Sequence, residues 1–170
     1  MPSNIAPCLW FDGKAEEAAK FYTSFFRDGK IVSTQVYSDT GKETHGQEAG
    51  TVMMVVFELN GQSFSALNGG PLFKFNEAIS LQIKCEDQEE INHYWSKLSE
   101  GGDPAKQVCG WVADKFGVSW QVIPKVLNDL MTDPDPEKTR RTFGALMGMK
   151  KVDIAALKDA HEGRVKTGEA

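Results

Sequence analysis

Apolar residues in the first half of the chain follow a strand-like pattern and then a helix-like one. Residues 5–11 form a short apolar run, which predicts a buried strand, and Asp12 is placed to cap a following helix. One face of that helix is apolar, through Ala15, Ala18, Ala19, Tyr22 and Phe26. Further strands are predicted at residues 30–37, 51–59 and 62–67. Asn60-Gly61 joins the last two and is a strong hairpin signal, while residues 38–50 predict a mobile polar loop.

The second half of the chain repeats this order of patterns. Residues 79–85 predict a strand, and Asp87 and Glu90 resemble the capping box of a helix that runs to residue 98. The apolar face of this helix holds Ile91, Tyr94, Trp95 and Leu98. Residues 107–113 and 118–123 predict two closing strands. The residues that follow predict short helices, which have no counterpart in the first half and would pack outside the sheet or against a second subunit.

A short phrase occurs in both halves. Residues 61–67 (GQSFSAL) match residues 117–123 (GVSWQVI) in a glycine, a serine, an aromatic residue and small or branched apolar residues, at an offset of 117 − 61 = 56. Each copy follows a helix that ends in adjacent aromatic residues, Phe21-Tyr22 or Tyr94-Trp95. Such duplication indicates two copies of one unit, neither of which buries its apolar face alone. We expect the function in a cavity between their two sheets.

Composition narrows the range of partners. The chain has 170 residues, 41% of them hydrophobic and 25% charged, as expected of one compact domain. Its net charge of −5 argues against nucleic acid and against anionic membranes. Its longest strongly apolar run, residues 52–57, is too short to span a bilayer, and no secretory signal is visible. Three cysteines without a CxxC pair predict reduced thiols and a cytoplasmic location.

Several phrases together resemble the PhnB-like family, whose members are also labelled 3-demethylubiquinone-9 3-methyltransferase, within the glyoxalase or vicinal-oxygen-chelate superfamily. The phrases cover roughly the whole chain. They are residues 7–11 (PCLWF), 15–18 (AEEA), 21–22 (FY), 94–98 (YWSKL), 109–111 (CGW), 114–121 (DKFGVSWQ) and 145–157 (ALMGMKKVDIAAL).

The resemblance implies an α+β fold in which two βαβββ modules form a glyoxalase/bleomycin-resistance-like half-barrel, with extra C-terminal helices. We therefore expect a single glyoxalase-like domain over residues 1–170, with modules at 1–68 and 78–123. Residues 69–77 would link the modules, and residues 124–170 would form the helical extension. Because glyoxalase-like domains commonly pair, the resemblance also implies a homodimer.

Metal-dependent members of this superfamily hold a divalent ion with His and Glu side chains, one from each of four strands. Counting along the repeat places the corresponding positions at Pro7, Ser65, Ser80 and Gln121. Pro and Ser are not competent ligands, and Gln121 offers only a neutral amide oxygen. A shift along the strands, to Leu9, Ala66 or Leu81, supplies no better ligand. We therefore expect no metal and no other cofactor.

Strand alternation predicts which residues line the cavity. In residues 80–85 (SLQIKC) one face is polar and the other apolar, so Ser80 and Gln82 should face the concave side and Lys84 its rim. The same parity places Ser65 and Gln121 on that side and turns Phe64 and Trp120 toward the core. Trp111 is a further candidate, as a wall for a ligand ring. The predicted ligand-binding residues are Ser65, Ser80, Gln82, Trp111 and Gln121. Alternatively, these polar groups bond only to each other or to water.

The histidines and Cys109 are weaker candidates. His45, His93 and His161 share no ligand spacing, so we interpret them as surface residues, although His45 lies in a loop that could close over a substrate. Lys106 is the only cation close to Cys109 in sequence, which favours a packing role for this thiol over a catalytic one.

Three functions remain open at this stage. The first is a protein that binds or transforms a small organic molecule in a metal-free cavity, with unknown catalytic residues. The second is sequestration of a drug-like molecule, as in resistance proteins of the superfamily. The third is a lyase, isomerase or dioxygenase with an atypical metal site. Methyltransferase chemistry is not expected, because residues 11–14 (FDGK) enter a helix without the glycine-rich turn of a Rossmann-type site.

Overall fold

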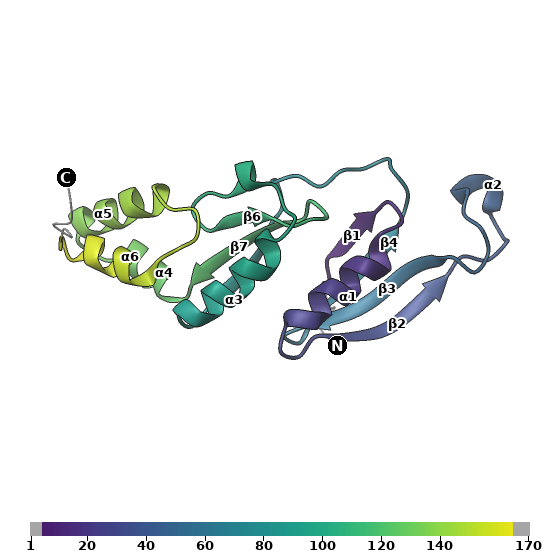
Figure 1. Ribbon diagram of the computed structural model, residues 1–170, viewed down its shortest axis with the longest axis horizontal. Coiled ribbons are helices and arrows are strands. Elements are labelled where there is room, and N and C mark those ends of the chain that lie inside the picture. The colour runs from purple at the N-terminus through teal and green to yellow at the C-terminus, as the bar shows by residue number, and fades with distance from the viewer. Residues whose placement is uncertain (1–4, 165–170) are drawn as a thin grey trace. The chain divides into compact units, whose positions relative to one another are not determined.

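The computed structural model describes residues 5–164, and its helices and strands are labelled in Figure 1. Contacts within the chain divide it into two compact units, with the boundary between Phe75 and Asn76. This boundary lies inside the segment expected to be a linker. Each unit contains its own sheet and its own apolar core.

The first unit is a four-stranded sheet with one long helix packed on it (Figure 1). The strand order is β1-β4-β3-β2, in which β1 is parallel to β4 and the other neighbours are antiparallel. The elements are β1 (Cys8–Phe11), α1 (Ala15–Phe25), β2 (Lys30–Val36), α2 (Lys42–His45), β3 (Val52–Leu59) and β4 (Gln62–Asn68). The short helix α2 lies in the segment that was expected to be an irregular polar loop.

Helix α1 covers one face of this sheet because both elements place apolar side chains on the shared side. Tyr22 is fully buried, and its ring stacks on Phe57 with 6.1 Å between centroids. Phe57 stacks in turn on Phe64, at 5.4 Å. Side chains alternate between the two faces of a strand, so Ser65 lies on the opposite, half-buried face.

The first turn of α1 is held from the sheet rather than by its own preceding residues. Asp12 was expected to cap this helix, but the N-cap residue is Lys14, which makes no side-chain cap. Instead the buried Asn68 accepts a 2.9 Å hydrogen bond from the backbone N–H of Ala15 through Oδ1. Its Nδ2 donates to the carbonyl of Val52 at 2.9 Å. One amide therefore joins α1, β3 and β4, a long-range cap with no local sequence signal.

The second unit contains a three-stranded sheet of order β5-β7-β6, with β5 parallel and β6 antiparallel to β7. Helix α3 packs through the buried Ile91 and Leu98 on the face that carries Val122 and Trp120. The elements are β5 (Leu81–Cys85), α3 (Gln88–Ser99), the 3-10 helix η1 (Pro104–Lys106), β6 (Trp111–Ala113), β7 (Ser119–Pro124), α4 (Val126–Met131), α5 (Pro136–Met147) and α6 (Ile154–His161).

The two units share a chain order of strand, helix and closing strands, as the repeated phrase predicts. Within the repeat, the second unit lacks a counterpart of β2 and of α2: over residues 76–164 no strand corresponds to β2, and η1 occupies that place in the chain. The segment contains Gly101-Gly102 and Pro104, and proline lacks the N–H that a ladder hydrogen bond requires. The second module is therefore βαββ rather than βαβββ.

The C-terminal helices belong to the second unit. Gln88 at the start of α3 accepts from the N–H of Ile154 at 2.9 Å and donates to the carbonyl of Val152 at 3.1 Å. Val152 and Leu157 are fully buried, whereas Phe143 and Met147 on α5 stay half exposed. The tail thus completes the core of its own unit. None of the helices in residues 5–164 is both long and apolar enough to cross a membrane.

The turn between β6 and β7 is organised by one buried carboxylate. Asp114 is 2% exposed, and its Oδ1 accepts from the backbone N–H groups of Phe116 and Val118 at 2.9 and 3.0 Å. Its Oδ2 accepts from Nε1 of the buried Trp120 at 2.8 Å. This contact satisfies the indole N–H inside the core and fixes Trp120 on the side of the sheet that faces α3.

We predict that Asp114→Ala lowers the free energy of unfolding by about 3 kcal/mol, because it leaves the indole N–H and two turn amides without their acceptor. Urea unfolding monitored by circular dichroism measures this change. Asp129→Ala is the matched control, since Asp129 is an exposed acid on α4 and its removal should change stability by less than about 0.5 kcal/mol. Equal effects of the two substitutions would contradict the role given to Asp114.

Candidate functional site

The open face of the second sheet, on the side away from α3, carries most of the polar candidates. On β5 the buried residues are Ile83 and Cys85, and the exposed ones are Gln82 and Lys84. On β7, Trp120 and Val122 are buried, and Gln121 between them is half-buried on the other side. These alternations place Gln82 and Gln121 on the face opposite α3.

The pairing of the strands brings three candidates into one row. Gln82 is the register partner of Gln121 across β5 and β7, and Trp111 is the partner of Gln121 across β6 and β7. Register partners lie side by side on the same face of a sheet. The row Gln82, Gln121, Trp111 therefore crosses the whole sheet, with two amides beside one half-buried indole ring.

The amides of this row form a directed chain of hydrogen bonds with Ser80. Nε2 of Gln82 donates to Oε1 of Gln121 at 3.2 Å. Nε2 of Gln121 donates to Oγ of Ser80 at 2.7 Å. Because Ser80 accepts in this chain, its own hydroxyl hydrogen can point outward toward a ligand. The structure thus brings Ser80, Gln82 and Gln121 into direct contact, with Trp111 alongside.

Ser65, the fifth candidate, belongs to the first unit. It lies on the open face of that unit's sheet, between Cys8 on β1 and Val56 on β3. Cys8 is exposed, and partial desolvation raises the pKa of its thiol. In each unit, therefore, two polar residues are register partners across the parallel strand pair. They are Cys8 and Ser65 in the first unit, and Gln82 and Gln121 in the second.

The strand register gives a direct alignment of the two units. The partner of Ser65 is Cys8, and the partner of Gln121, which corresponds to Ser65 in the repeat, is Gln82. The offset between the first strands of the two units is therefore 82 − 8 = 74, not the 73 that the aromatic residues of the helices suggest. Cys8 was missed because a parallel pairing has no local signal in the sequence.

The histidines lie elsewhere. His45 stacks on Tyr37 with 4.5 Å between ring centroids, and its Nδ1 accepts from the N–H of Gln47 at 3.0 Å, so it shapes the segment around α2. His93 is exposed on α3, where its ring contacts Tyr94. His161, expected at the surface, is only 5% exposed. That expectation is wrong because α5 and α6 pack against each other and enclose the ring.

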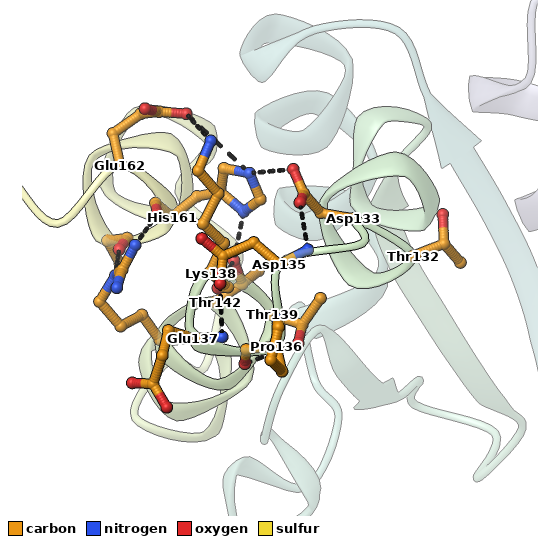
Figure 2. Close-up of polar contacts among 12 residues, drawn as sticks. Thr132, Asp133, Asp135, Pro136, Glu137, Lys138, Thr139, Thr142, His161 and Glu162 are labelled. Carbon is orange, nitrogen blue, oxygen red and sulfur yellow. Dashed lines mark hydrogen bonds and ion pairs between the residues drawn. The ribbon is translucent and has the colours of Figure 1, made fainter.

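Figure 2 shows the polar contacts around His161. Its Nδ1 lies 2.9 Å from Oγ1 of Thr142, and its Nε2 lies 3.2 Å from Oδ2 of Asp133. An Asp–His–Thr series resembles the acid–base–nucleophile order of a catalytic triad. However, the Thr142 side chain is fully buried, and its hydroxyl donates to the carbonyl of Lys138 at 2.9 Å. No substrate atom can reach that hydroxyl. The cluster is structural and joins the α4–α5 turn, α5 and α6.

The cysteines differ in environment. Cys85 is buried on the α3 side of β5, and desolvation raises its pKa to about 12, so it behaves as an apolar core residue. Cys109 has a φ of 52° and, with Gly110, forms the tip of a tight turn between Val108 and Trp111. Its N–H donates to the carbonyl of Met149 at 2.7 Å. The role of Cys109 visible in the structure is to fix this turn.

Among residues 5–164, no group of three or more His, Cys, Asp or Glu side chains is arranged to hold a metal ion. The chemistry available on the open face of the second sheet is therefore that of neutral amides, a hydroxyl, an indole and the ammonium of Lys84. Such groups orient a ligand and stabilise negative charge through hydrogen bonds.

Comparison with known proteins identifies relatives of the chain. Residues 3–123 match a family model described as 3-demethylubiquinone-9 3-methyltransferase. A solved structure described as a putative 3-demethylubiquinone-9 3-methyltransferase, PhnB protein, from Bacillus cereus is 39% identical, with a TM-score of 0.60. The alignment covers 72% of this chain and 99% of that one. None of the curated proteins matches.

Two more distant solved structures are also similar to the chain. Protein PA1353 from Pseudomonas aeruginosa is 20% identical, with a TM-score of 0.56, over 72% of this chain and 98% of that one. The fosfomycin resistance protein FosX from Listeria monocytogenes, solved with Mn(II) and sulfate ion, is 12% identical, with a TM-score of 0.45. That match covers 72% of this chain and 91% of FosX.

We predict that the ionised carboxylate of Asp133 stabilises the folded protein and that this stabilisation is lost at acidic pH. A hydrogen bond from the N–H of Asp135, followed by His161 and Lys138, holds the pKa of Asp133 below its ordinary value. In the unfolded chain the pKa of an aspartate carboxyl is about 3.9. Because the pKa is lower in the folded protein, the carboxylate stabilises the fold at pH values above about 3.9, and this stabilisation is lost as the pH falls through the folded-state pKa. Asp133→Asn should therefore lose less stability than the native protein between about pH 5 and pH 2.

Urea unfolding at a series of pH values measures this difference. Asp129→Asn, on the exposed side of α4, serves as the control and should keep the pH profile of the native protein. If Asp133→Asn also keeps that profile, the carboxylate does not stabilise the helical cluster.

Proposed function

Because the chain belongs to the family described as 3-demethylubiquinone-9 3-methyltransferase, a PhnB-like group within the glyoxalase superfamily, we propose that it binds or transforms a small organic molecule without a resident metal ion. The proposed binding surface is the open face of the second sheet. The observation that carries the proposal is the directed chain Gln82, Gln121, Ser80 beside Trp111. It combines an apolar ring with convergent polar groups, as small-molecule sites do.

The residues at the positions that the family resemblance assigns to metal ligands do not fit a divalent ion. In the second unit these residues are Ser80 and Gln121, a hydroxyl and a neutral amide that already bond to each other. In the first unit they are Pro7 and Ser65, which supply no anionic or imidazole group. A divalent ion favours anionic or imidazole ligands, and this set supplies neither at neutral pH.

The family label names a methyltransferase, but the start of α1 does not offer a nucleotide site. In Rossmann-type enzymes the first helix receives phosphate oxygens at its N-terminal N–H groups. Here the N–H of Ala15 is occupied by Oδ1 of Asn68, and the preceding turn carries the single Gly13. We therefore propose binding or conversion of a ligand on the sheet rather than methyl transfer from a nucleotide cofactor held in that way.

Within this proposal Gln121 positions the ligand. Its Oε1 accepts from Gln82 and one of its Nε2 hydrogens bonds to Ser80, while its second Nε2 hydrogen makes no hydrogen bond within residues 5–164. Loss of its side chain removes one donor and releases both neighbours. Ligand orientation should therefore depend on Gln121 more than on any other residue of the row.

Two sequence-based expectations remain predictions of their own: homodimerisation and a cytoplasmic location. The exposed apolar side chains of Phe143 and Met147 on α5 support an association surface. Light scattering coupled to size-exclusion chromatography measures the oligomeric state. A monomer at micromolar concentration would contradict the first expectation.

We predict that Gln121→Ala weakens binding of a ligand found by thermal-shift screening of a metabolite panel by about tenfold, the equivalent of about 1.4 kcal/mol for lost hydrogen bonds. Isothermal titration calorimetry measures the affinity. Trp120→Phe, on the α3 side, should lower stability but leave the affinity unchanged, and the exposed Gln62→Ala should change neither. A larger loss of affinity in Trp120→Phe than in Gln121→Ala would overturn the assignment of the face. Turnover of the ligand would indicate an enzyme, and binding without turnover would indicate sequestration.

We predict that ligand affinity is independent of divalent metal. Elemental analysis of the purified protein should find well under one equivalent of zinc, nickel, manganese or iron. Dialysis against EDTA should leave the ligand affinity unchanged. One equivalent of bound metal, together with loss of affinity after chelation, would contradict the metal-free proposal.

A further inference from the structure

The open face of the second sheet carries one charged residue, Lys84. Strands β5, β6 and β7 contain no other Asp, Glu, Lys or Arg within their bounds. Lys84 is exposed, and it is the register partner of Ile123, two residues along β5 from Gln82. The spacing between Lys84 and Gln82 along the strand is about 7 Å, which a lysine side chain spans.

The acids nearest to Lys84 in sequence are engaged elsewhere. Glu86 pairs with Lys125, across the ends of β5 and β7. Asp87 caps α3 by accepting from the N–H of Glu90 at 2.9 Å, and the carboxylate of Glu90 accepts from the N–H of Glu86 at 2.9 Å. Over residues 5–164, Lys84 makes neither an ion pair nor a side-chain hydrogen bond. Within residues 76–164, its positive charge is thus not neutralised by an ion pair.

The neutral groups on the same face as Lys84 keep three donor hydrogens. The hydroxyl hydrogen of Ser80 and the second Nε2 hydrogens of Gln82 and Gln121 bond to no protein acceptor in the described part of the chain. The oxygens of these groups are neutral acceptors, and the three strands carry no carboxylate. Three donor hydrogens beside one cation favour a ligand with anionic acceptor oxygens.

The first unit lacks this charge pattern at the equivalent place. Cys8 corresponds to Gln82 in the pairing, so Lys84 corresponds to Trp10, which pairs with Leu67 as Lys84 pairs with Ile123. The indole N–H of Trp10 donates to the carbonyl of Gly70 at 2.8 Å and is not free for a ligand. The two modules therefore differ at this position. The first has a tryptophan whose N–H bonds to the protein, and the second has a lysine that makes no ion pair within residues 5–164.

We propose that the open face of the second sheet selects a small organic oxyanion, a carboxylate or a phosphate joined to an apolar ring, and that Lys84 determines this specificity. The inference rests on the proposed function and adds the ligand class. The ring packs on Trp111, and the anionic oxygens accept from Ser80, Gln121 and the Lys84 ammonium. Lys84 is a specificity-determining residue and carries out no covalent step.

The test uses three probes with the same phenyl ring: phenylacetate, phenyl phosphate and the neutral phenylacetamide. Heteronuclear NMR titration of the full chain follows the side-chain amide signals of Gln82 and Gln121, assigned with single Gln→Ala variants. At least one anion should shift both amide signals and bind more tightly than phenylacetamide. Its affinity should fall as NaCl rises from about 50 to about 500 mM, because salt screens exposed charges.

Lys84→Gln should weaken the anion about three- to fivefold, the range for an exposed ion pair, and leave phenylacetamide unchanged. Lys84→Arg should retain most of the anion affinity. Lys97→Gln, on α3 against the other face of the sheet, changes the net charge equally and should have no effect. The anion that binds more tightly distinguishes a carboxylate ligand from a phosphate ligand.

The outcomes separate this inference from the proposed function. If phenylacetamide shifts the two amides and binds as tightly as the anions, or if Lys84→Gln and Lys97→Gln weaken the anions equally, the anion inference is overturned and the binding face stands. If none of the three probes shifts the amides of Gln82 and Gln121, and Gln121→Ala leaves the affinity of the ligand found by screening unchanged, both proposals are overturned.

Discussion

In the second unit, side chains alternate along strands that α3 covers on one face. This alternation determines which residues lie on the opposite face. Helix α3 buries Ile83, Trp120 and Val122, so every intervening residue of β5 and β7 must point the other way. The parallel pairing of these strands then sets Gln82 beside Gln121, and the antiparallel pairing of β6 sets Trp111 beside Gln121. A slip of one residue would bury the amides under α3 and expose the core.

The strands and helices of both modules could be predicted because their signals are local. Alternation in residues 80–85, the helical spacing of Ile91, Tyr94 and Leu98, and the Asn60-Gly61 turn each lie within a few residues of one another. Family resemblance, confirmed by the match over residues 3–123, added the fold. The candidates Ser80, Gln82 and Gln121 also follow from local parity, and the structure places them on one face.

What the sequence could not predict depends on contacts between distant residues. The register that pairs Cys8 with Ser65 joins residues that lie 65 − 8 = 57 positions apart in the sequence. The cap of α1 by Asn68 crosses a similar distance, and it replaces the locally expected Asp12. His161 is buried only because α5 and α6 pack together. The second module lacks a strand that the repeat predicts. Residues Gly101 to Pro104 lie at that place, and their glycines and proline disfavour a strand.

The C-terminal helices, although outside the repeat, are part of the candidate site. The cluster of Asp133, Thr142 and His161 holds α5 and α6 together, and the segment between these helices presents the carbonyls of Met149 and Lys150. Those carbonyls accept from the N–H groups of Cys109 and Gly110 at 2.7 and 2.8 Å.

The turn that these carbonyls hold leads directly into Trp111. Val108 and Trp111 exchange backbone hydrogen bonds of 3.2 and 2.7 Å around the two left-handed residues. Left-handed backbone costs about 1 kcal/mol at a residue other than glycine, so Cys109 adopts it only because surrounding contacts hold the turn. The helical extension thus helps to determine where the Trp111 ring lies, beside the amide of its register partner Gln121.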